Sequence, residues 1–173
     1  MSIGMFLDRD GVINEVLTNR VKYVNTPEDF YLLDGVGEAI RCFNMRGFKV
    51  FVVTNQGGIG LGLMSQSELY AIHKKMEADL ATFGARLDDI AYCPHKPHAN
   101  CAYRKPNPQM ILDLAKKHDI DLEKSYMVGD RASDIQAGKA AGLKTMIIGN
   151  RQETKADADM FFPDLISVAK WLG

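Results

Sequence analysis

Two aspartates near the start of the chain, in the run Asp8-Arg9-Asp10-Gly11, have the types and spacing needed for phosphate chemistry. The carboxylate of Asp8 could attack a phosphorus atom and so divide one difficult displacement into two easier ones. The carboxyl group of Asp10 could protonate the departing alkoxide and then deprotonate the attacking water. We therefore predict that Asp8 is a nucleophile and Asp10 a general acid and base. For an isolated Asp-x-Asp, the simpler interpretation is a turn at the end of a strand.

A third aspartate, Asp130, is expected to be the main magnesium ligand. Magnesium takes six oxygen ligands and usually binds one or two carboxylates together with waters and a substrate phosphate. Asp8, Asp130 and the main-chain carbonyl of Asp10 could supply the protein's share. Asp134 follows one helical turn later and could bind the metal through water or orient a base. The alternative is that Asp130 and Asp134 are solvated residues at the start of a helix, favoured by its dipole.

Two further groups of residues could bind a phosphate. The hydroxyl of Thr54 and the main-chain amides of Asn55 and Gln56 could cradle phosphate oxygens. Lys105 would supply a point charge against a dianion, and Arg104 a bidentate fork. Taken alone, the first group could be an ordinary loop and the second a solvated basic pair.

The elements that must position these residues alternate between short apolar runs and segments of helical period. Ser65 and Glu68 form a capping box that should open a helix, and its apolar face is lined by Leu69, Ile72, Met76, Leu80 and Phe83. A second helix is expected over residues 36–45. Strands are expected at residues 3–7, 50–53, 90–92, 126–128, 145–148 and 160–162. This alternation predicts an α/β fold of three layers, with a doubly wound, mostly parallel sheet between helices.

The candidate residues follow the carboxyl ends of the predicted strands, where ligands bind in such sheets. We expect a single domain over residues 1–173, with a loop rich in Cys and His at residues 93–106. The segment of residues 14–34 is too short for a separate helical cap domain.

Composition excludes several classes of protein. The chain of 173 residues is 46% hydrophobic and 25% charged, with a formal net charge of −1, which argues against broad binding to nucleic acid or to an anionic membrane. It has no apolar run of the roughly 18 residues that a membrane span needs. Its three cysteines, Cys42, Cys93 and Cys101, do not suggest a disulfide framework. We expect a cytoplasmic monomer that acts on a small phosphorylated metabolite.

Four segments stand in a recognisable order along the chain: Asp8-Arg9-Asp10-Gly11-Val12, Thr54-Asn55-Gln56, Arg104-Lys105-Pro106 and Gly129-Asp130-Arg131-x-x-Asp134. In this order they resemble the four motifs of the haloacid dehalogenase superfamily, which implies its Rossmann-like fold without a cap domain. The resemblance implies that Asp8 is the nucleophile and Asp10 the acid and base. It also implies the residues around the substrate and the magnesium ion: Thr54 and Lys105 on the transferred phosphate, Arg104 and Arg131 on the rest of the substrate, and Asp8, Asp10 and Asp130 on the metal.

The segments Tyr92-Cys93-Pro94-His95 and Cys101-x-x-Arg104-Lys105-Pro106 resemble the branch of histidinol phosphatases and D-glycero-D-manno-heptose-1,7-bisphosphate 7-phosphatases. In that branch Cys-x-His and Cys-x-Cys bind a structural zinc ion, so the resemblance implies zinc on Cys93, His95 and Cys101. The fourth position is Tyr103 here, and structural zinc takes four ligands. His98 could fill the gap, or the loop could be free of metal.

The leading hypothesis is therefore a phosphatase of carbohydrate metabolism that acts on a heptose bisphosphate, with histidinol phosphate as the second substrate. Thr54-Asn55-Gln56 with Gly58 and Gly60 also resembles polynucleotide 3′-phosphatases, although no basic face supports that function. A phosphomutase would need a cap domain. A non-catalytic module that binds phosphorylated ligands is disfavoured because every catalytic side chain is present.

Overall fold

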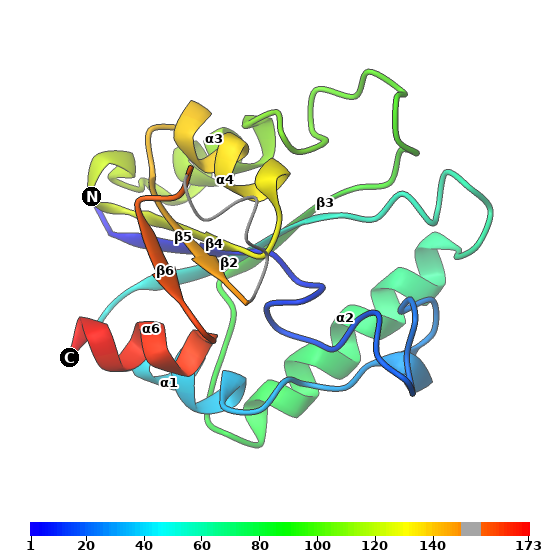
Figure 1. Cartoon of the computed structure of the whole chain (residues 1–173), viewed down its shortest axis with the longest axis horizontal. Coiled ribbons are helices and arrows are strands. Elements are labelled where there is room, and N and C mark those ends of the chain that lie inside the picture. Colours follow the sequence, from blue (N-terminus) through cyan, green and yellow to red (C-terminus); the bar gives the residue numbers. More distant parts are fainter. Residues whose placement is uncertain (150–156) are drawn as a thin grey trace.

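The computed structural model describes residues 1–149 and 157–173, and these residues form one parallel sheet with helices on both faces (Figure 1). Neighbouring strands in the sheet follow the order β3-β2-β1-β4-β5-β6, and every neighbouring pair is parallel. The strands are β1 (Gly4–Leu7), β2 (Lys49–Asn55), β3 (Asp89–Cys93), β4 (Tyr126–Gly129), β5 (Lys144–Ile148) and β6 (Met160–Phe162).

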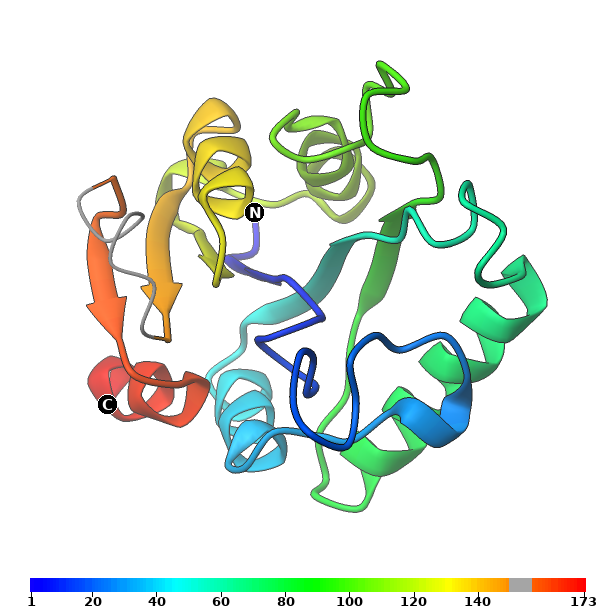
Figure 2. The same ribbon diagram turned by 45° about the vertical axis from the view of Figure 1, so that its right-hand side comes forward.

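The helices lie in two layers, one on each face of the sheet. In Figure 2, α3 and α4 lie on one face, and α1, α2 and α6 lie on the other. The helices are α1 (Val36–Met45), α2 (Gln66–Ala81), α3 (Gln109–His118), α4 (Ala132–Ala140) and α6 (Leu165–Leu172), with short 3-10 helices η1 (Pro27–Asp29) and η2 (Leu122–Lys124). The predicted three-layer, doubly wound fold is thus confirmed.

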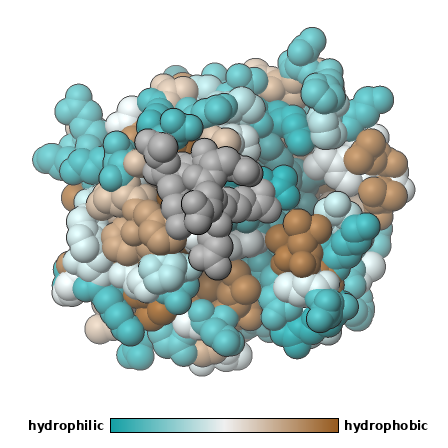
Figure 3. Space-filling model, in the orientation of Figure 1, coloured by the Kyte–Doolittle hydropathy of each residue, from teal (hydrophilic) through white to brown (hydrophobic). Residues whose placement is uncertain are grey.

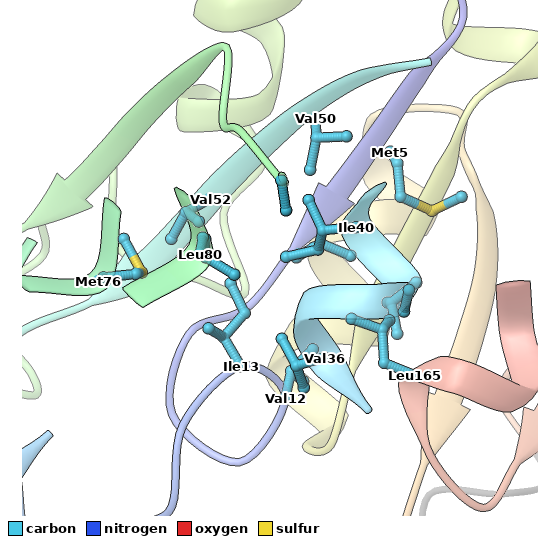
Figure 4. Packing of buried hydrophobic residues seen from close by; sticks show 14 of the residues in the cluster. Met5, Val12, Ile13, Val36, Ile40, Val50, Val52, Met76, Leu80 and Leu165 are labelled. Carbon is cyan, nitrogen blue, oxygen red and sulfur yellow. The ribbon is translucent and has the colours of Figure 1, made fainter. Parts of the chain in front are cut away.

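Alternate residues of each central strand point to opposite faces of the sheet, so each strand contributes to two hydrophobic clusters. Met5 and Leu7 join the larger cluster, under α1, α2 and α6. Figure 4 shows Met5 with other members of this cluster. Phe6 between them joins the smaller cluster, under α3 and α4. Because both faces of the sheet are covered, β1 and residues 50–53 of β2 are apolar throughout rather than alternating. Burial of each large apolar side chain stabilises the fold by roughly 1.5–3 kcal/mol.

The helix that follows the second strand begins as the capping box predicts. The Ser65 Oγ atom accepts a hydrogen bond from the Glu68 main-chain amide (3.0 Å), and Glu68 Oε1 accepts one from the Ser65 amide (2.9 Å). One detail of the prediction is wrong: Phe83 lies beyond the end of α2 and is partly exposed. The chain turns after the helix, which places Phe83 against Gly37 of α1 instead.

The strand order explains where a site can form. The chain moves from β1 to β2 and β3 on one side and then crosses to β4 on the other, so the order switches at β1. Asp8 follows β1, Asn55 ends β2 and Asp130 follows β4, and all three therefore lie at the same edge of adjacent strands. Between β1 and α1 the chain forms one short element, η1, so no cap domain is inserted there.

The face of the molecule shown in Figure 3 is mainly hydrophilic, and its hydrophobic residues form separate patches. None of the helices in the described residues is both long and apolar enough to cross a membrane.

Candidate active site

The ammonium group of Lys105 lies at the centre of the polar cluster at the carboxyl edge of the sheet. Its Nζ atom donates hydrogen bonds to Asp134 Oδ1 (2.6 Å), to the Val53 carbonyl (2.8 Å) and to Asp8 Oδ1 (2.9 Å). An ammonium group has three protons, so these acceptors use all of them. A phosphate oxygen could therefore bind Lys105 directly only by replacing one of the three.

Asn55 fixes the main chain of Lys105. Its Oδ1 atom accepts from the Lys105 amide (2.9 Å), and its Nδ2 atom donates to the Lys105 carbonyl (3.1 Å). The sequence predicts that the main-chain amide of Asn55 contacts the substrate phosphate. The side chain of Asn55 lines the cavity described below, but both of its polar atoms are committed to Lys105. Asn55 thus anchors the loop after β3 to the end of β2.

Three carboxylates face one another beside Lys105. Asp8, Asp130 and Asp134 each place one oxygen within 4.8 Å of the others. Asp134 Oδ2 accepts from the main-chain amides of Asp130 (3.2 Å) and Arg131 (3.1 Å), which holds it at the start of α4. Gly11 has a φ of 86°, and a side chain there would collide with the Asp130 carboxylate, so glycine permits the close approach.

Burial and neighbouring charges shift the pKa values of Asp8 and Lys105. Burial and the neighbouring Asp134 carboxylate hold the pKa of Asp8 well above its usual range, although the charge of Lys105 acts in the opposite direction. Burial alone would lower the pKa of Lys105, but the Asp134 and Asp8 carboxylates raise it above its usual value. Negative charge therefore exceeds positive charge among these side chains, and a cation bound here would be stabilised.

Asp10 has a different environment from Asp8. Its Oδ1 atom accepts three hydrogen bonds, from Arg9 Nη2 (2.8 Å), Asn14 Nδ2 (3.0 Å) and Arg9 Nε (3.1 Å). Its Oδ2 atom accepts a longer one from Gln56 Nε2 (3.3 Å). Burial raises the pKa of the Asp10 carboxyl, but Arg9 and the other donors outweigh burial and lower it overall. Oδ2 is the oxygen with capacity left to exchange a proton.

A cavity of about 520 Å³ opens above these side chains. The candidate residues that line it are Asp8, Asp10, Asn55, Gln56, Arg104, Lys105, Arg131 and Asp134. Its apolar wall includes Val16, Tyr23, Leu61 and Leu63, from the loops after β1 and β2. Thr54 is buried behind Gln56, whose Nε2 atom donates to Thr54 Oγ1 (2.8 Å).

One part of the predicted phosphate cradle is wrong. The main-chain amide of Gln56 donates to the Cys93 carbonyl (2.8 Å), so it is not directed at a phosphate. The Gly60 amide likewise donates to the Pro94 carbonyl (2.9 Å), and a side chain at Gly60 would collide with this loop. The turn after β2 therefore rests on the Cys/His loop, because these bonds continue the pairing of β2 with β3.

Three of the residues predicted to bind zinc, Cys93, His95 and Cys101, lie together in this loop. Cys93 Sγ is 3.4 Å from Cys101 Sγ and 3.7 Å from His95 Nδ1. His98 does not join them: it is exposed, and its φ of 67° marks a sharp local turn of the chain. The Tyr103 hydroxyl donates to Asp113 Oδ2 (2.7 Å), so it is directed at α3 and not at the sulfur atoms.

The Cys/His loop also carries Arg104. The Nη1 atom of Arg104 donates to the His95 carbonyl (3.1 Å), which holds the guanidinium at the wall of the cavity beside Gly57. Arg131 follows Asp130 at the start of α4 and lines the same cavity. The two arginines thus reach the cavity from separate segments.

Sequence reasoning missed the residues that orient Asp10. Arg9 is fully buried and Asn14 is buried, and both bond to Asp10 Oδ1. The signal for Arg9 was its position between two candidate catalytic aspartates at the end of a buried strand, where a solvated arginine is not expected. No sequence signal distinguished Asn14 from an ordinary loop residue.

Comparison with known proteins agrees with these features. A family model described as HAD-hydrolase-like matches residues 102–169. The D-glycero-beta-D-manno-heptose-1,7-bisphosphate 7-phosphatase of Rhodopseudomonas palustris is 44% identical over 145 residues, which cover 80% of this chain and 78% of that protein. The enzyme of the same name from Bordetella bronchiseptica is 37% identical over 175 residues, which cover 97% and 96% of the two chains.

Solved structures give the same result. The crystal structure of the D,D-heptose 1,7-bisphosphate phosphatase of B. bronchiseptica, complexed with magnesium and phosphate, superposes with a TM-score of 0.89 at 36% identity and covers 99% of this chain and 98% of that one. The corresponding enzyme of Burkholderia thailandensis has a TM-score of 0.73 at 30% identity, with 99% and 98% covered. This chain therefore belongs to the haloacid dehalogenase superfamily of hydrolases, in the branch of the heptose-1,7-bisphosphate 7-phosphatases.

Proposed function

We propose that this phosphatase removes the 7-phosphate of D-glycero-D-manno-heptose 1,7-bisphosphate. The observation that carries the proposal is the similarity to the B. bronchiseptica enzyme of that name, which extends over 97% of this chain. The cavity is consistent with a sugar that bears two phosphates. Lys105 lies near Asp8, where one phosphate would react, while Arg104 and Arg131 line the cavity and could bind the other. The apolar wall suits the C–H faces of a sugar.

In the proposed reaction, an Asp8 carboxylate oxygen attacks the phosphorus atom and the bond from phosphorus to the sugar oxygen breaks. Asp10 transfers a proton from Oδ2 to that oxygen as it leaves. Water then attacks the phosphorus atom of the aspartyl phosphate and gives a proton to Asp10. This hydrolysis releases inorganic phosphate and restores the Asp8 carboxylate. Lys105 contributes its charge beside Asp8, and Thr54 supports the side chain of Gln56.

Removal of the nucleophile and removal of the acid should have different effects. We expect Asp8→Asn to abolish turnover, because an amide cannot attack phosphorus. Asp10→Asn should slow turnover by roughly 10²–10⁴-fold, the usual contribution of general acid–base catalysis. Steady-state kinetics with phosphate release as the readout would measure both. Asp119→Asn, at an exposed site at the end of α3, is the control and should leave the rate unchanged. Residual turnover in Asp8→Asn would place the nucleophile elsewhere.

We further propose that Asp8, Asp130 and the main-chain carbonyl of Asp10 hold a magnesium ion, with Asp134 as an additional ligand. The residues fit this ion, because every donor is an oxygen and three carboxylates converge. Bound magnesium would neutralise the negative charge of these carboxylates and of the phosphate, and it would lower the raised pKa of Asp8.

Metal removal should therefore inactivate the enzyme reversibly. We expect EDTA to abolish phosphate release, because Asp8 and Asp130 would otherwise repel a phosphate dianion. Added magnesium should restore the rate. Isothermal titration calorimetry would measure magnesium binding directly, and Asp130→Asn should weaken it. Full turnover after exhaustive chelation would contradict the proposal.

The choice of substrate can be tested by a comparison of initial rates. Purified protein with magnesium would be given the α and β anomers of heptose 1,7-bisphosphate, histidinol phosphate and a 3′-phosphorylated oligonucleotide. Both anomers are included because matching relatives are named for each. Charge-assisted hydrogen bonds contribute roughly 1.5–3 kcal/mol each. Even one such bond from Arg104 or Arg131 to a second phosphate should thus raise kcat/KM by about 10–10²-fold over a monophosphate.

Histidinol phosphate carries an ammonium group, which Arg104 and Arg131 would repel, so it is the second candidate. The net charge of −1 disfavours the oligonucleotide. A higher kcat/KM for either of these two substrates than for both heptose anomers would overturn the substrate assignment.

We also propose that Cys93, His95 and Cys101 bind a zinc ion. Two sulfur atoms and one imidazole nitrogen are ligands that zinc prefers, and here they converge in the loop that supports Gln56 and Arg104. Because the Tyr103 hydroxyl bonds to Asp113 and His98 lies outside this group, a water molecule would complete four-coordination.

Elemental analysis of the purified protein should then find about one zinc ion per chain, as for other sites with such ligands. Cys93→Ser should lose the zinc, and the loop should become sensitive to protease. Cys42→Ser, on α1, is the matched control and should keep the zinc, as should His98→Ala. Zinc retained by Cys93→Ser would refute the ligand assignment, and zinc-free wild-type protein would refute the site.

Finally, we propose that the chain works as a single-domain monomer in the cytoplasm. Both hydrophobic clusters lie against the same sheet, which supports one domain. The three free cysteines are consistent with a reducing compartment.

A further inference from the structure

Arg9 is the largest side chain that is fully buried among the described residues, and its charge has two partners. The Nε and Nη2 atoms donate to Asp10 Oδ1 at 3.1 and 2.8 Å. The Nη1 atom lies 3.1 Å from His73 Nε2. A guanidinium group only donates hydrogen bonds, so His73 must accept this one, with its ring proton on Nδ1.

His73 belongs to the buried face of α2, with Leu69, Ile72, Met76 and Leu80. Burial and the charge of Arg9 lower the pKa of His73 to about 3, which is consistent with a neutral ring that accepts. The Tyr92 ring packs edge-on against it, with 6.3 Å between the ring centres. The ring is therefore held by packing, and its Nε2 atom is a fixed acceptor.

These contacts determine which oxygen of Asp10 remains reactive. Arg9 and Asn14 together supply three donors to Oδ1, more than its lone pairs readily accommodate. Oδ2 is left with the longer contact to Gln56 and faces the turn after β2. The orientation of the carboxyl group thus depends on the position of the guanidinium, and that position depends on His73.

We propose that His73 is a positioning residue: it accepts a hydrogen bond from Arg9 and thereby keeps Asp10 Oδ2 aimed at the leaving oxygen of the substrate. The inference rests on the proposed role of Asp10 as general acid. Without His73, a buried N–H of Arg9 would lack its acceptor, and the guanidinium would turn toward another partner. The carboxyl group bound to Arg9 would move with it. A displacement of about 1 Å in a catalytic group can cost roughly 10²-fold in rate.

The experiment measures how the rate depends on the leaving group. A series of substituted phenyl phosphates, from phenyl to p-nitrophenyl, varies the basicity of the departing oxygen while the phosphate stays the same. The value of kcat/KM reports the steps through phosphoryl transfer to Asp8. Basic leaving groups need a proton from Asp10, and weakly basic ones do not. These esters contain no heptose, so the comparison does not depend on the proposed natural substrate.

We expect His73→Leu to lower kcat/KM for phenyl phosphate by about 10–10²-fold and to change it little for p-nitrophenyl phosphate. A plot of log kcat/KM against leaving-group pKa should therefore be steeper than in the wild type, as it should also be in Asp10→Asn. His73→Gln places an amide oxygen near the position of Nε2 and should restore the wild-type slope. Met76→Leu is the matched control, because Met76 is buried on the same helix and is not bonded to Arg9 in the described structure.

A merely structural role would give a different pattern. A uniform fall over all leaving groups in His73→Leu, or an unchanged slope, would overturn the inference. If thermal unfolding shows that His73→Leu does not fold, the same comparison uses His73→Asn. The amide of Asn is too short to reach Arg9, so this variant should also give a steeper slope. A wild-type slope in Asp10→Asn would overturn the proposed acid and this inference together. A steep slope in Asp10→Asn with a wild-type slope in His73→Leu would overturn this inference alone.

Discussion

Lys105 places one ammonium group between the carboxylates of Asp8 and Asp134, and all three side chains are less than 10% exposed. Burial of a charge costs several kcal/mol unless close partners compensate for it. Here the partners are within hydrogen-bonding distance, and Val53 supplies a carbonyl for the remaining proton. Such a cluster stabilises the fold less than an apolar core would. The excess of negative charge in this cluster is consistent with a site that a cation and the substrate of the enzyme complete.

The same ammonium group joins segments that are distant in sequence. Asp8 follows β1, Val53 lies in β2, Lys105 belongs to the loop after β3, and Asp134 lies in the first turn of α4, after β4. These strands are adjacent and parallel, so their carboxyl ends converge. Asn55 then fixes the main chain of Lys105 to β2. The site is thus built on the rigid sheet, and the loops around the cavity are left to determine which substrate enters.

The sheet and the location of the site were predictable because they follow from local patterns. Apolar runs identified the strands, and parallel strands bring the residues after them to one edge. Side-chain pairings were not predictable in this way. The Gln56 amide bonds to Cys93 because β3 extends further than its apolar run indicated, and nothing in the helical pattern singled out His73. Which residues approach Cys93 and Cys101 depends on turns such as that at His98, which the sequence pattern does not specify.

In the proposed reaction, phosphate is transferred to Asp8 itself, whose carboxylate accepts a hydrogen bond from Lys105 at the carboxyl end of β1. The direct measurement is to quench the enzyme during turnover with magnesium, reduce it with borohydride and map the peptides by mass spectrometry. Borohydride converts an aspartyl phosphate to homoserine, so transfer to Asp8 should give homoserine at position 8. Homoserine at another aspartate, or none under conditions of rapid turnover, would contradict it.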